Sequence, residues 1–124
     1  MKSENPTMLV VDDEIEILKM FRDIFQPRGW RVFTAPTGTL GLANVEKEKI
    51  DIVLLDIRLP DISGIEILKK IKKTHPGLPV IVVTAFGYKD DLVTKALSFG
   101  AAGYVSKGVS ITELMGVIDN TLAK

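Results

Sequence analysis

The sequence predicts an α/β fold: a single doubly wound domain with a five-stranded parallel sheet, strand order 2-1-3-4-5, and five helices on both faces. Two observations predict it. Strand-like and helix-like stretches alternate five times along the 124 residues, with short connections between them. Three of the strand-like stretches are aliphatic on successive residues, which is typical of parallel strands buried on both faces.

The first strand is predicted at residues 8–11, a run of four apolar side chains. Three apolar residues then recur on one face of a helix, Ile17, Phe21 and Ile24. This helix is expected to stop near Pro27, since proline and glycine end helices.

The second strand is a weaker prediction at residues 30–35, where strand-like residues lie beside a glycine. Leu40, Ala43 and Val45 predict the second helix by their helical spacing. Two glycines inside that stretch weaken the prediction, because glycine has low helix propensity.

The third strand is the aliphatic run at residues 52–55. The helix after it is expected to begin near Ser63 and to end before the turn at residues 75–77. Its apolar face is Ile65, Leu68 and Ile71.

The fourth strand is predicted at residues 80–83 and the fourth helix at 89–99, with Gly100 placed to end it. A fifth, weaker strand is expected at 102–106. Ser110 with Glu113 has capping-box spacing and predicts the start of the fifth helix.

The composition indicates one globular domain over residues 1–124, with residues 1–6 expected to form a flexible N-terminus. Sixteen basic and sixteen acidic residues cancel, so no whole-chain charge favours nucleic acid or an anionic membrane as partner. The absence of cysteine excludes disulfides and thiolate metal sites, and it suits a reducing compartment, so we expect a cytoplasmic location. No apolar run approaches the roughly 20 residues of a spanning helix.

Polar side chains follow four of the five predicted strands. They are Asp12 and Asp13 after the first, Asp56 after the third, Thr84 at the end of the fourth and Lys107 after the fifth. Because the first and third strands are neighbours in the predicted order, the three carboxylates should lie together and repel one another unless a cation intervenes. Mg2+ prefers such oxygen ligands, so we expect Mg2+ held by Asp12 and Asp13.

The remaining groups suit phosphoryl chemistry. Lys107 offers a positive charge and Thr84 a hydroxyl donor to phosphoryl oxygens. A carboxylate can attack phosphorus and form an aspartyl-phosphate, and Asp56 is the predicted nucleophile. Each residue alone is more often structural; together, five complementary groups at one sheet edge favour a functional site.

Three other classes of protein stay open. A magnesium-dependent phosphohydrolase would need a dedicated acid-base residue and a substrate pocket or cap, for which 124 residues leave little room. A flavin or nucleotide carrier of the same fold needs glycine or hydroxyl residues in the first loop, where the acidic residues 12–14 would repel phosphate. The third is a protein-binding domain that accepts no phosphate.

The sequence resembles the receiver domains of two-component response regulators, which have a CheY-like, flavodoxin-like fold. Four segments carry the resemblance over nearly the whole chain: VVDDE at 10–14, DIRLP at 56–60 with Gly64, VTA at 83–85 and YVSK at 104–107. All four occur in the family's order and at its spacings.

This resemblance implies that Asp56 is the phosphorylation site, that Asp12, Asp13, Asp56 and the Ile57 carbonyl bind Mg2+, and that Thr84 and Lys107 contact the phosphate. It implies a sensor histidine kinase as phosphoryl donor. It also implies a signalling domain that catalyses only its own phosphorylation and dephosphorylation, and is therefore not an enzyme with a separate substrate. An output domain in the same chain or a downstream protein would receive the signal. Dimer formation on phosphorylation is left open, and direct nucleic acid binding by this domain is not expected.

In similar domains Thr84 and Tyr104 form the switch, and the surface of helix four, strand five and helix five reports the phosphorylation state. For Tyr104 a half-buried strand aromatic is an equally good interpretation.

One position departs from the family pattern. The lysine is usually followed by proline in a cis peptide, whereas Gly108 follows Lys107 here. A cis bond before a residue other than proline costs about 2.5–4 kcal/mol, so we predict a trans bond and a loosened loop. A receiver-like domain that binds partners without phosphorylation is therefore kept as the alternative function.

Overall fold

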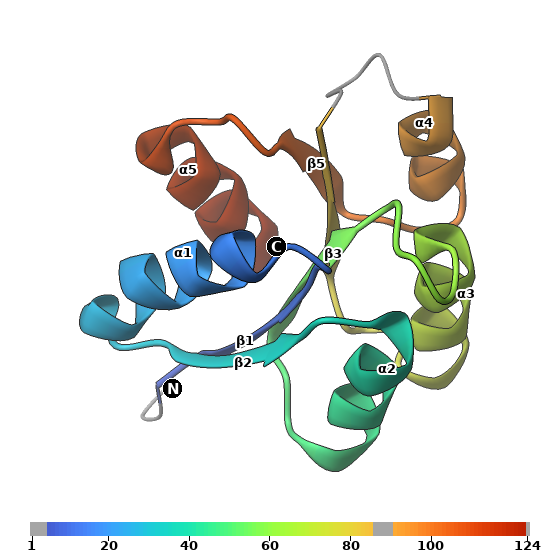
Figure 1. Cartoon of the computed structure of the whole chain (residues 1–124), viewed down its shortest axis with the longest axis horizontal. Helices are drawn as coiled ribbons and strands as arrows, with labels where there is room; N and C mark the ends of the chain where they lie inside the picture. Colours follow the sequence, from blue (N-terminus) through green and yellow to red (C-terminus); the bar gives the residue numbers. More distant parts are fainter. Residues whose placement is uncertain (1–4, 86–90, 124) are drawn as a thin grey trace.

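The computed structural model describes residues 5–85 and 91–123, and its parallel sheet lies between two layers of helices (Figure 1). The strands are β1 (Thr7–Val11), β2 (Arg31–Ala35), β3 (Ile52–Asp56), β4 (Val80–Thr84) and β5 (Gly103–Ser106). Their order is β2-β1-β3-β4-β5, and every neighbouring pair is parallel. The predicted fold class and strand order are confirmed, and each strand end lies within one residue of its prediction.

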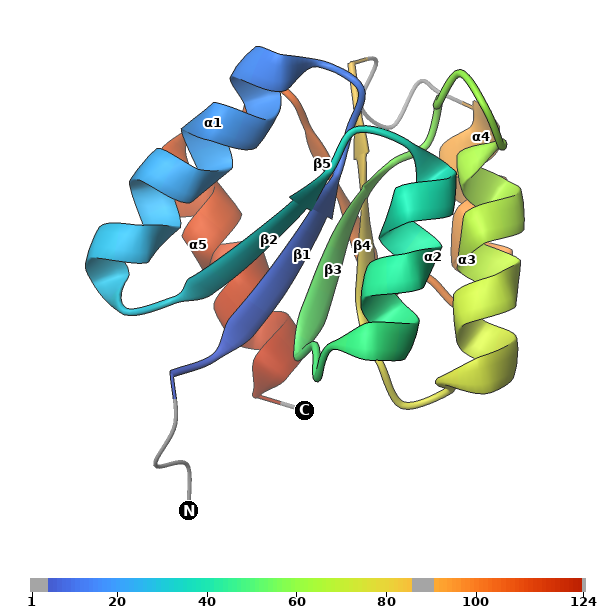
Figure 2. The same ribbon diagram turned by 60° about the horizontal axis from the view of Figure 1, so that its bottom comes forward.

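The helices are α1 (Ile15–Phe25), α2 (Gly38–Lys47), α3 (Gly64–Thr74), α4 (Asp91–Ser98) and α5 (Ile111–Leu122), with a short 3-10 turn, η1 (Gln26–Arg28), after α1. Figure 2 shows α1 and α5 on one face of the sheet and α2, α3 and α4 on the other. In the part of the chain that is described, no helix combines the length and the apolar character needed to cross a bilayer.

Helix ends follow the expected local chemistry. The Ser63 hydroxyl accepts a hydrogen bond from the backbone N–H of Ile65, and the Ser110 hydroxyl accepts one from Glu113. Gly100 ends α4 with a φ of 103°, a left-handed conformation that favours glycine. Residues 89–90 of the predicted fourth helix, like residues 1–4 of the expected flexible start, lie outside the described residues.

Two apolar clusters hold the sheet between its helices. One contains side chains of β1, β3 and β4 that pack against α2, α3 and α4, with Leu9, Leu55 and Ile67 fully buried. The other packs the opposite side of the same strands against α1 and α5, with Phe25, Leu54 and Ile118 at its centre. Consecutive strand residues therefore serve both clusters, which explains why the central strands are apolar throughout.

The inward face of α2 differs from the sequence prediction. The helix is present, but Leu40 is 50% exposed, Ala43 is also exposed, and the buried positions are Gly38, Gly41 and Val45. A Cβ built on Gly38 would lie 2.6 Å from Ile67 Cδ1, and one on Gly41 would lie 2.8 Å from Val11 Cγ2. The glycines therefore form the contact face, because α2 lies too close to β1 and α3 for a larger side chain.

Candidate functional site

The site forms where the parallel strands end at one edge of the sheet (Figure 2). Asp12 follows β1, Asp56 ends β3 and Thr84 ends β4, and all three are buried, with exposed fractions of 1%, 4% and 1%. The neighbouring cleft is lined by Asp13, Glu14, Asp56, Arg58, Thr84 and Lys107. The structure thus brings together the five polar groups that the sequence singled out at the strand ends.

Three carboxylates form an acidic cluster. Oxygen atoms of Asp12, Asp13 and Asp56 lie within 4.8 Å of one another, with Asp12 and Asp56 buried and Asp13 exposed to solvent. Asp12 Oδ1 accepts a hydrogen bond from the Glu14 backbone N–H at 2.9 Å. Its other oxygen, Oδ2, is buried and accepts no hydrogen bond from any residue in the described part of the chain. This orphaned oxygen and the all-carboxylate donor set fit a hard divalent cation.

Lys107 neutralises part of this charge. Its Nζ lies 3.1 Å from Asp12 Oδ2 and 3.2 Å from Asp56 Oδ2, and it also pairs with Glu14 Oε1. Lys107 Nζ donates its hydrogen bond to the other oxygen, Asp12 Oδ1, at 3.4 Å, so the 3.1 Å approach to Oδ2 is a charge contact. One ammonium therefore pairs with three acidic side chains, and Asp13 adds a fourth carboxylate to the site, so these groups keep a net negative charge.

The ionisation of these groups reflects burial and charge together. Burial raises the pKa of the Asp12 and Asp56 carboxyls, while backbone N–H donors and Lys107 oppose the rise. Burial also acts against the Lys107 ammonium, but hydrogen bonds to Glu14 and Asp12 and the charge of Asp56 outweigh it and raise its pKa. Burial therefore disfavours the charged form of both acids, and a bound cation would favour it.

The loop between β3 and α3 closes against the site. Asp56 Oδ1 accepts a hydrogen bond from the Arg58 backbone N–H at 3.0 Å, and the Ile57 carbonyl accepts one from Gly64 at 3.1 Å. A Cβ on Gly64 would lie 2.5 Å from Ile57 Cα and 2.6 Å from the Ile57 oxygen, so only glycine fits there. The Ile57 side chain is buried and its carbonyl faces Gly64, whereas Asp56 and Arg58 on either side of it line the cleft.

Thr84 and Tyr104 lie on the two neighbouring strands at the end of the sheet. In the β4–β5 pairing, Val82 is opposite Tyr104 and Thr84 is opposite Ser106. Thr84 and Tyr104 therefore project from the same face of the sheet, because side chains alternate along a strand. Tyr104 is 38% exposed, whereas Thr84 is buried, so Tyr104 is the solvent-exposed residue of the two.

The peptide bond after Lys107 is trans, because no cis bond occurs among the described residues, and that prediction is confirmed. The Lys107 backbone N–H donates to the Thr84 carbonyl at 2.9 Å, and the Val109 N–H donates to Ser106 at 3.0 Å. These bonds fix the start of the β5–α5 loop. The predicted loosening of this loop stays a prediction.

Two contacts near the site were not predicted from the sequence. Glu14 was noted only as part of an acidic motif, yet it pairs with Lys107. Asp61, in the β3–α3 loop, accepts hydrogen bonds from the first residues of α2. Its proximity to Pro60 marks a turn in the sequence, but nothing local indicates a partner more than 20 residues away.

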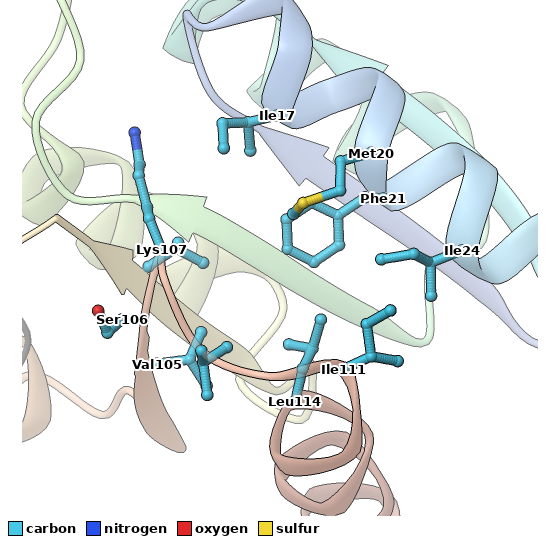
Figure 3. A pocket seen from close by; sticks show the side chains of 11 residues that line it. Ile17, Met20, Phe21, Ile24, Val105, Ser106, Lys107, Ile111 and Leu114 are labelled. Atoms are coloured by element: carbon cyan, nitrogen blue, oxygen red, sulfur yellow. The ribbon is translucent and has the colours of Figure 1, made fainter.

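An apolar groove opens beside the cleft, between α1 and the start of α5 (Figure 3). Side chains of α1, including Ile17 and Met20, face Ile111 and Leu114 across it, and the aliphatic stem of Lys107 lines one end. Met20 is 37% and Ile111 45% exposed, so the groove rim offers apolar surface next to the acidic cluster.

Comparison with known proteins gives a consistent result. Residues 8–119 match the family model described as the response regulator receiver domain. The chain is 38% identical over 109 residues to the probable transcriptional regulatory protein TcrX of Mycobacterium tuberculosis, covering 88% of this chain and 46% of that protein. It therefore spans about half the length of that relative.

A second relative is similar in length. Sporulation initiation phosphotransferase F of Bacillus subtilis is 34% identical over 118 residues, covering 95% of this chain and 94% of that protein. Among solved structures, the response regulator protein TrrA of Thermotoga maritima, crystallised in complex with Mg2+ and BeF, superimposes with a TM-score of 0.82 at 33% identity. That alignment covers 94% of this chain and 99% of TrrA.

Proposed function

This chain belongs to the response regulator receiver domains, signalling domains of two-component systems, and we propose that it accepts a phosphoryl group on Asp56 with the help of Mg2+. One observation carries the assignment of the residue: the buried Asp56 carboxylate lies beside Asp12 and Asp13, within 4.8 Å, and 3.2 Å from the Lys107 ammonium. No other described residue combines a carboxylate nucleophile, neighbouring metal ligands and a cation in one cleft.

The proposed metal ligands are Asp12, Asp13, Asp56 and the backbone carbonyl of Ile57. A bound Mg2+ would neutralise the carboxylates and attract the oxygens of the incoming phosphoryl group. The Asp12 oxygen that accepts no hydrogen bond and the raised pKa of the Asp12 and Asp56 carboxyls support this ligand set, because a bound cation would coordinate that oxygen and offset the cost of burying the two charges. The structure of TrrA with Mg2+ and BeF supports the choice of metal.

In the proposed transfer, an Asp56 carboxylate oxygen forms a bond to phosphorus while the bond from phosphorus to the donor breaks. The donor's leaving group is the imidazole of a histidine kinase, or acetate when acetyl phosphate is used. Lys107 Nζ, now 3.2 Å from Asp56 Oδ2, would stay close to the phosphoryl oxygens, and the Thr84 hydroxyl would donate to another of them. Positioning and charge carry the catalysis, as in other phosphoryl transfers.

We further propose that phosphorylation is read through Thr84 and Tyr104. A phosphoryl group adds about 1.5–2 negative charges, which would draw the Thr84 hydroxyl toward it. Tyr104 lies on the same face one strand away and is half exposed, so its ring could turn inward as Thr84 moves. The surface of α4, β5 and α5 would then differ between the two states and select the partner.

The phosphoryl donor is proposed to be a sensor histidine kinase that docks over the apolar groove in Figure 3. A protein that delivers a phosphoryl group to Asp56 must cover the cleft, and the exposed side chains of Ile111 and Met20 lie at its rim. Burying them would add apolar contact area beside the reacting groups. An output domain in the same chain or a separate downstream protein would receive the signal.

Activity without phosphorylation is not favoured. The glycine after Lys107 was the reason to keep that alternative, yet Lys107 Nζ reaches both Asp12 and Asp56 with the trans bond in place. The proposal also assigns no substrate other than the phosphodonor, so the domain would catalyse only its own phosphorylation and dephosphorylation.

Intact mass after incubation with acetyl phosphate and Mg2+ tests the proposal. The wild type should gain one phosphoryl group, roughly 80 Da, and Asp56→Asn or a metal-free sample should gain none. Gain of the group by Asp56→Asn would refute the assignment. Ile111→Ser tests the groove. It should slow transfer from a phosphorylated histidine kinase and leave the rate with acetyl phosphate unchanged. Equal slowing with both donors would show that the kinase does not dock on the groove.

A further inference from the structure

Asp61 joins two parts of the chain that carry different halves of the site. Its Oδ1 accepts a hydrogen bond from the Gly38 N–H at 3.0 Å, and its Oδ2 accepts one from the Thr39 N–H at 3.0 Å and one from the Thr39 hydroxyl at 2.9 Å. Gly38 and Thr39 are the first two residues of α2. The carboxylate therefore closes the N-terminus of a helix that lies more than 20 residues earlier in the sequence.

This contact completes the cap of α2. The Thr37 hydroxyl accepts from the Leu40 N–H, so the first three N–H groups of the helix are satisfied by Asp61 and Thr37 together. A negative charge at a helix N-terminus is favourable, and the backbone donors from Gly38 and Thr39 lower the pKa of the Asp61 carboxyl. Asp61 is thus ionised and firmly bound to α2 at neutral pH.

On its other side, Asp61 belongs to the loop that begins directly after Asp56. That loop contains the Ile57 carbonyl and the Arg58 N–H that contacts Asp56 Oδ1. Its start and end are linked by the hydrogen bond from Gly64 to the Ile57 carbonyl. A displacement of the middle of the loop would therefore shift the backbone of Ile57, next to Asp56.

Helix α2, in turn, packs against β1, the strand that Asp12 and Asp13 follow. Gly41 lies so close to Val11 that a Cβ there would be 2.8 Å from Val11 Cγ2, and Val11 directly precedes Asp12. On its other side α2 approaches α3 at Gly38 and Ile67. The start of α2 and the β3–α3 loop lie at the same edge of the molecule (Figure 2).

We propose that Asp61 is a positioning residue for the magnesium site, an inference that rests on the proposed function. By fixing the β3–α3 loop to α2, it holds the Arg58 N–H that bonds to Asp56 Oδ1, and so holds this carboxylate in place relative to Asp12 and Asp13, which follow β1. Loss of a residue that directly orients a metal ligand typically lowers metal affinity 10- to 100-fold, and Asp61 acts on the ligands only through the loop. We therefore expect its loss to weaken Mg2+ binding by roughly 3- to 10-fold.

The test is calorimetric titration of the full chain with MgCl2, using wild type, Asp61→Ala and Asp61→Asn. Asp51→Asn is the matched control, because Asp51 Oδ2 accepts the Thr7 backbone N–H at 2.7 Å, just before β3 begins and so at the far end of that strand from Asp56. It should lower stability in urea while leaving Mg2+ affinity within about twofold of wild type. Both Asp61 variants should bind Mg2+ more weakly.

Phosphorylation kinetics give the second readout. With acetyl phosphate, the Asp61 variants should need more Mg2+ for half-maximal rate and should approach the wild-type rate when Mg2+ is saturating. If Asp61→Ala lowers stability but binds Mg2+ as wild type does, Asp61 is only a helix cap and the inference is overturned. If wild type itself binds no Mg2+, the proposed function fails instead.

A milder variant guards against loss of folding. Thr39→Val removes the hydroxyl donor to Asp61 and keeps both backbone donors, so it should weaken Mg2+ binding less than Asp61→Asn does. Unchanged affinity in Asp61→Asn together with Thr39→Val would also overturn the inference.

Discussion

Asp56→Asn should make the folded domain more stable in metal-free buffer at neutral pH, although it destroys the proposed phosphorylation site. The Asp56 side chain is buried, and burial raises the pKa of its carboxyl, so its charge is unfavourable in the folded state. Asparagine has nearly the same shape and keeps Oδ1 as acceptor for the Arg58 N–H. The substitution therefore removes the charge and little else.

The size of the effect follows from the distances. At an effective dielectric constant of about 20, two unit charges within 4.8 Å repel by about 3.5 kcal/mol or more, so Asp12 and Asp13 both oppose Asp56. The same estimate gives an attraction of about 5 kcal/mol to Lys107 at 3.2 Å. Solvent screens the exposed Asp13, so the repulsion exceeds the attraction by about 1–2 kcal/mol. This excess corresponds to a rise in Tm of about 3–8 °C.

Thermal and urea unfolding followed by circular dichroism measure this difference. Magnesium should remove this advantage: wild type gains about 2.7 kcal/mol when the free ion is a hundredfold above its dissociation constant, and the variant gains less. Asp23→Asn, on the exposed surface of α1, is the control and should change neither value. A metal-free Asp56→Asn that unfolds below wild type would refute the reasoning, since the Lys107 pair would then outweigh the repulsion.

Three further predictions concern the same framework. The stability advantage of Asp56→Asn should shrink as pH falls through the raised pKa and vanish below about 4. The penalty is complete where both the folded and the unfolded acid are ionised, and it disappears only where both are protonated; unfolding at a series of pH values checks it. Gly64→Ala should cost about 2 kcal/mol or more in urea unfolding, because the new methyl group would meet the Ile57 backbone at 2.5 Å. Gly116→Ala, in α5 with nothing within 4 Å, should instead add about 0.5–1 kcal/mol, and a loss there would show an unseen contact.

Much of the fold could be predicted because its information is local. Consecutive aliphatic residues in β1, β3 and β4 pack alternately into the apolar clusters on the two faces of the sheet. The sequence of each strand therefore indicates burial on both sides. Serine caps and Gly100 mark helix ends in the sequence. The convergence of Asp12, Asp56 and Lys107 then follows from topology alone, since the carboxyl ends of parallel strands meet at one edge.

What the sequence could not reveal depends on distances between elements. The apolar face of α2 was expected at Leu40, Ala43 and Val45. Only Val45 is buried, because the helix lies so close to Val11 and Ile67 that glycines occupy the rest of that face. A pattern of hydrophobicity contains no information about how near two elements approach. The bond from Asp61 to α2 is hidden for the same reason, because both partners are ordinary turn residues when considered separately.

The position of Lys107 combines both kinds of information. In place of a cis proline, the trans bond to Gly108 leaves the backbone after Lys107 with glycine's conformational freedom. What locates the side chain is charge: its Nζ pairs with Asp12, Asp56 and the exposed Glu14, while its backbone N–H is fixed to Thr84. A lysine placed by carboxylates can follow a phosphoryl group as the charge distribution changes, whereas one placed by a rigid backbone could not. The departure from the family's proline is therefore compatible with phosphoryl transfer, because in this chain electrostatics performs the placement.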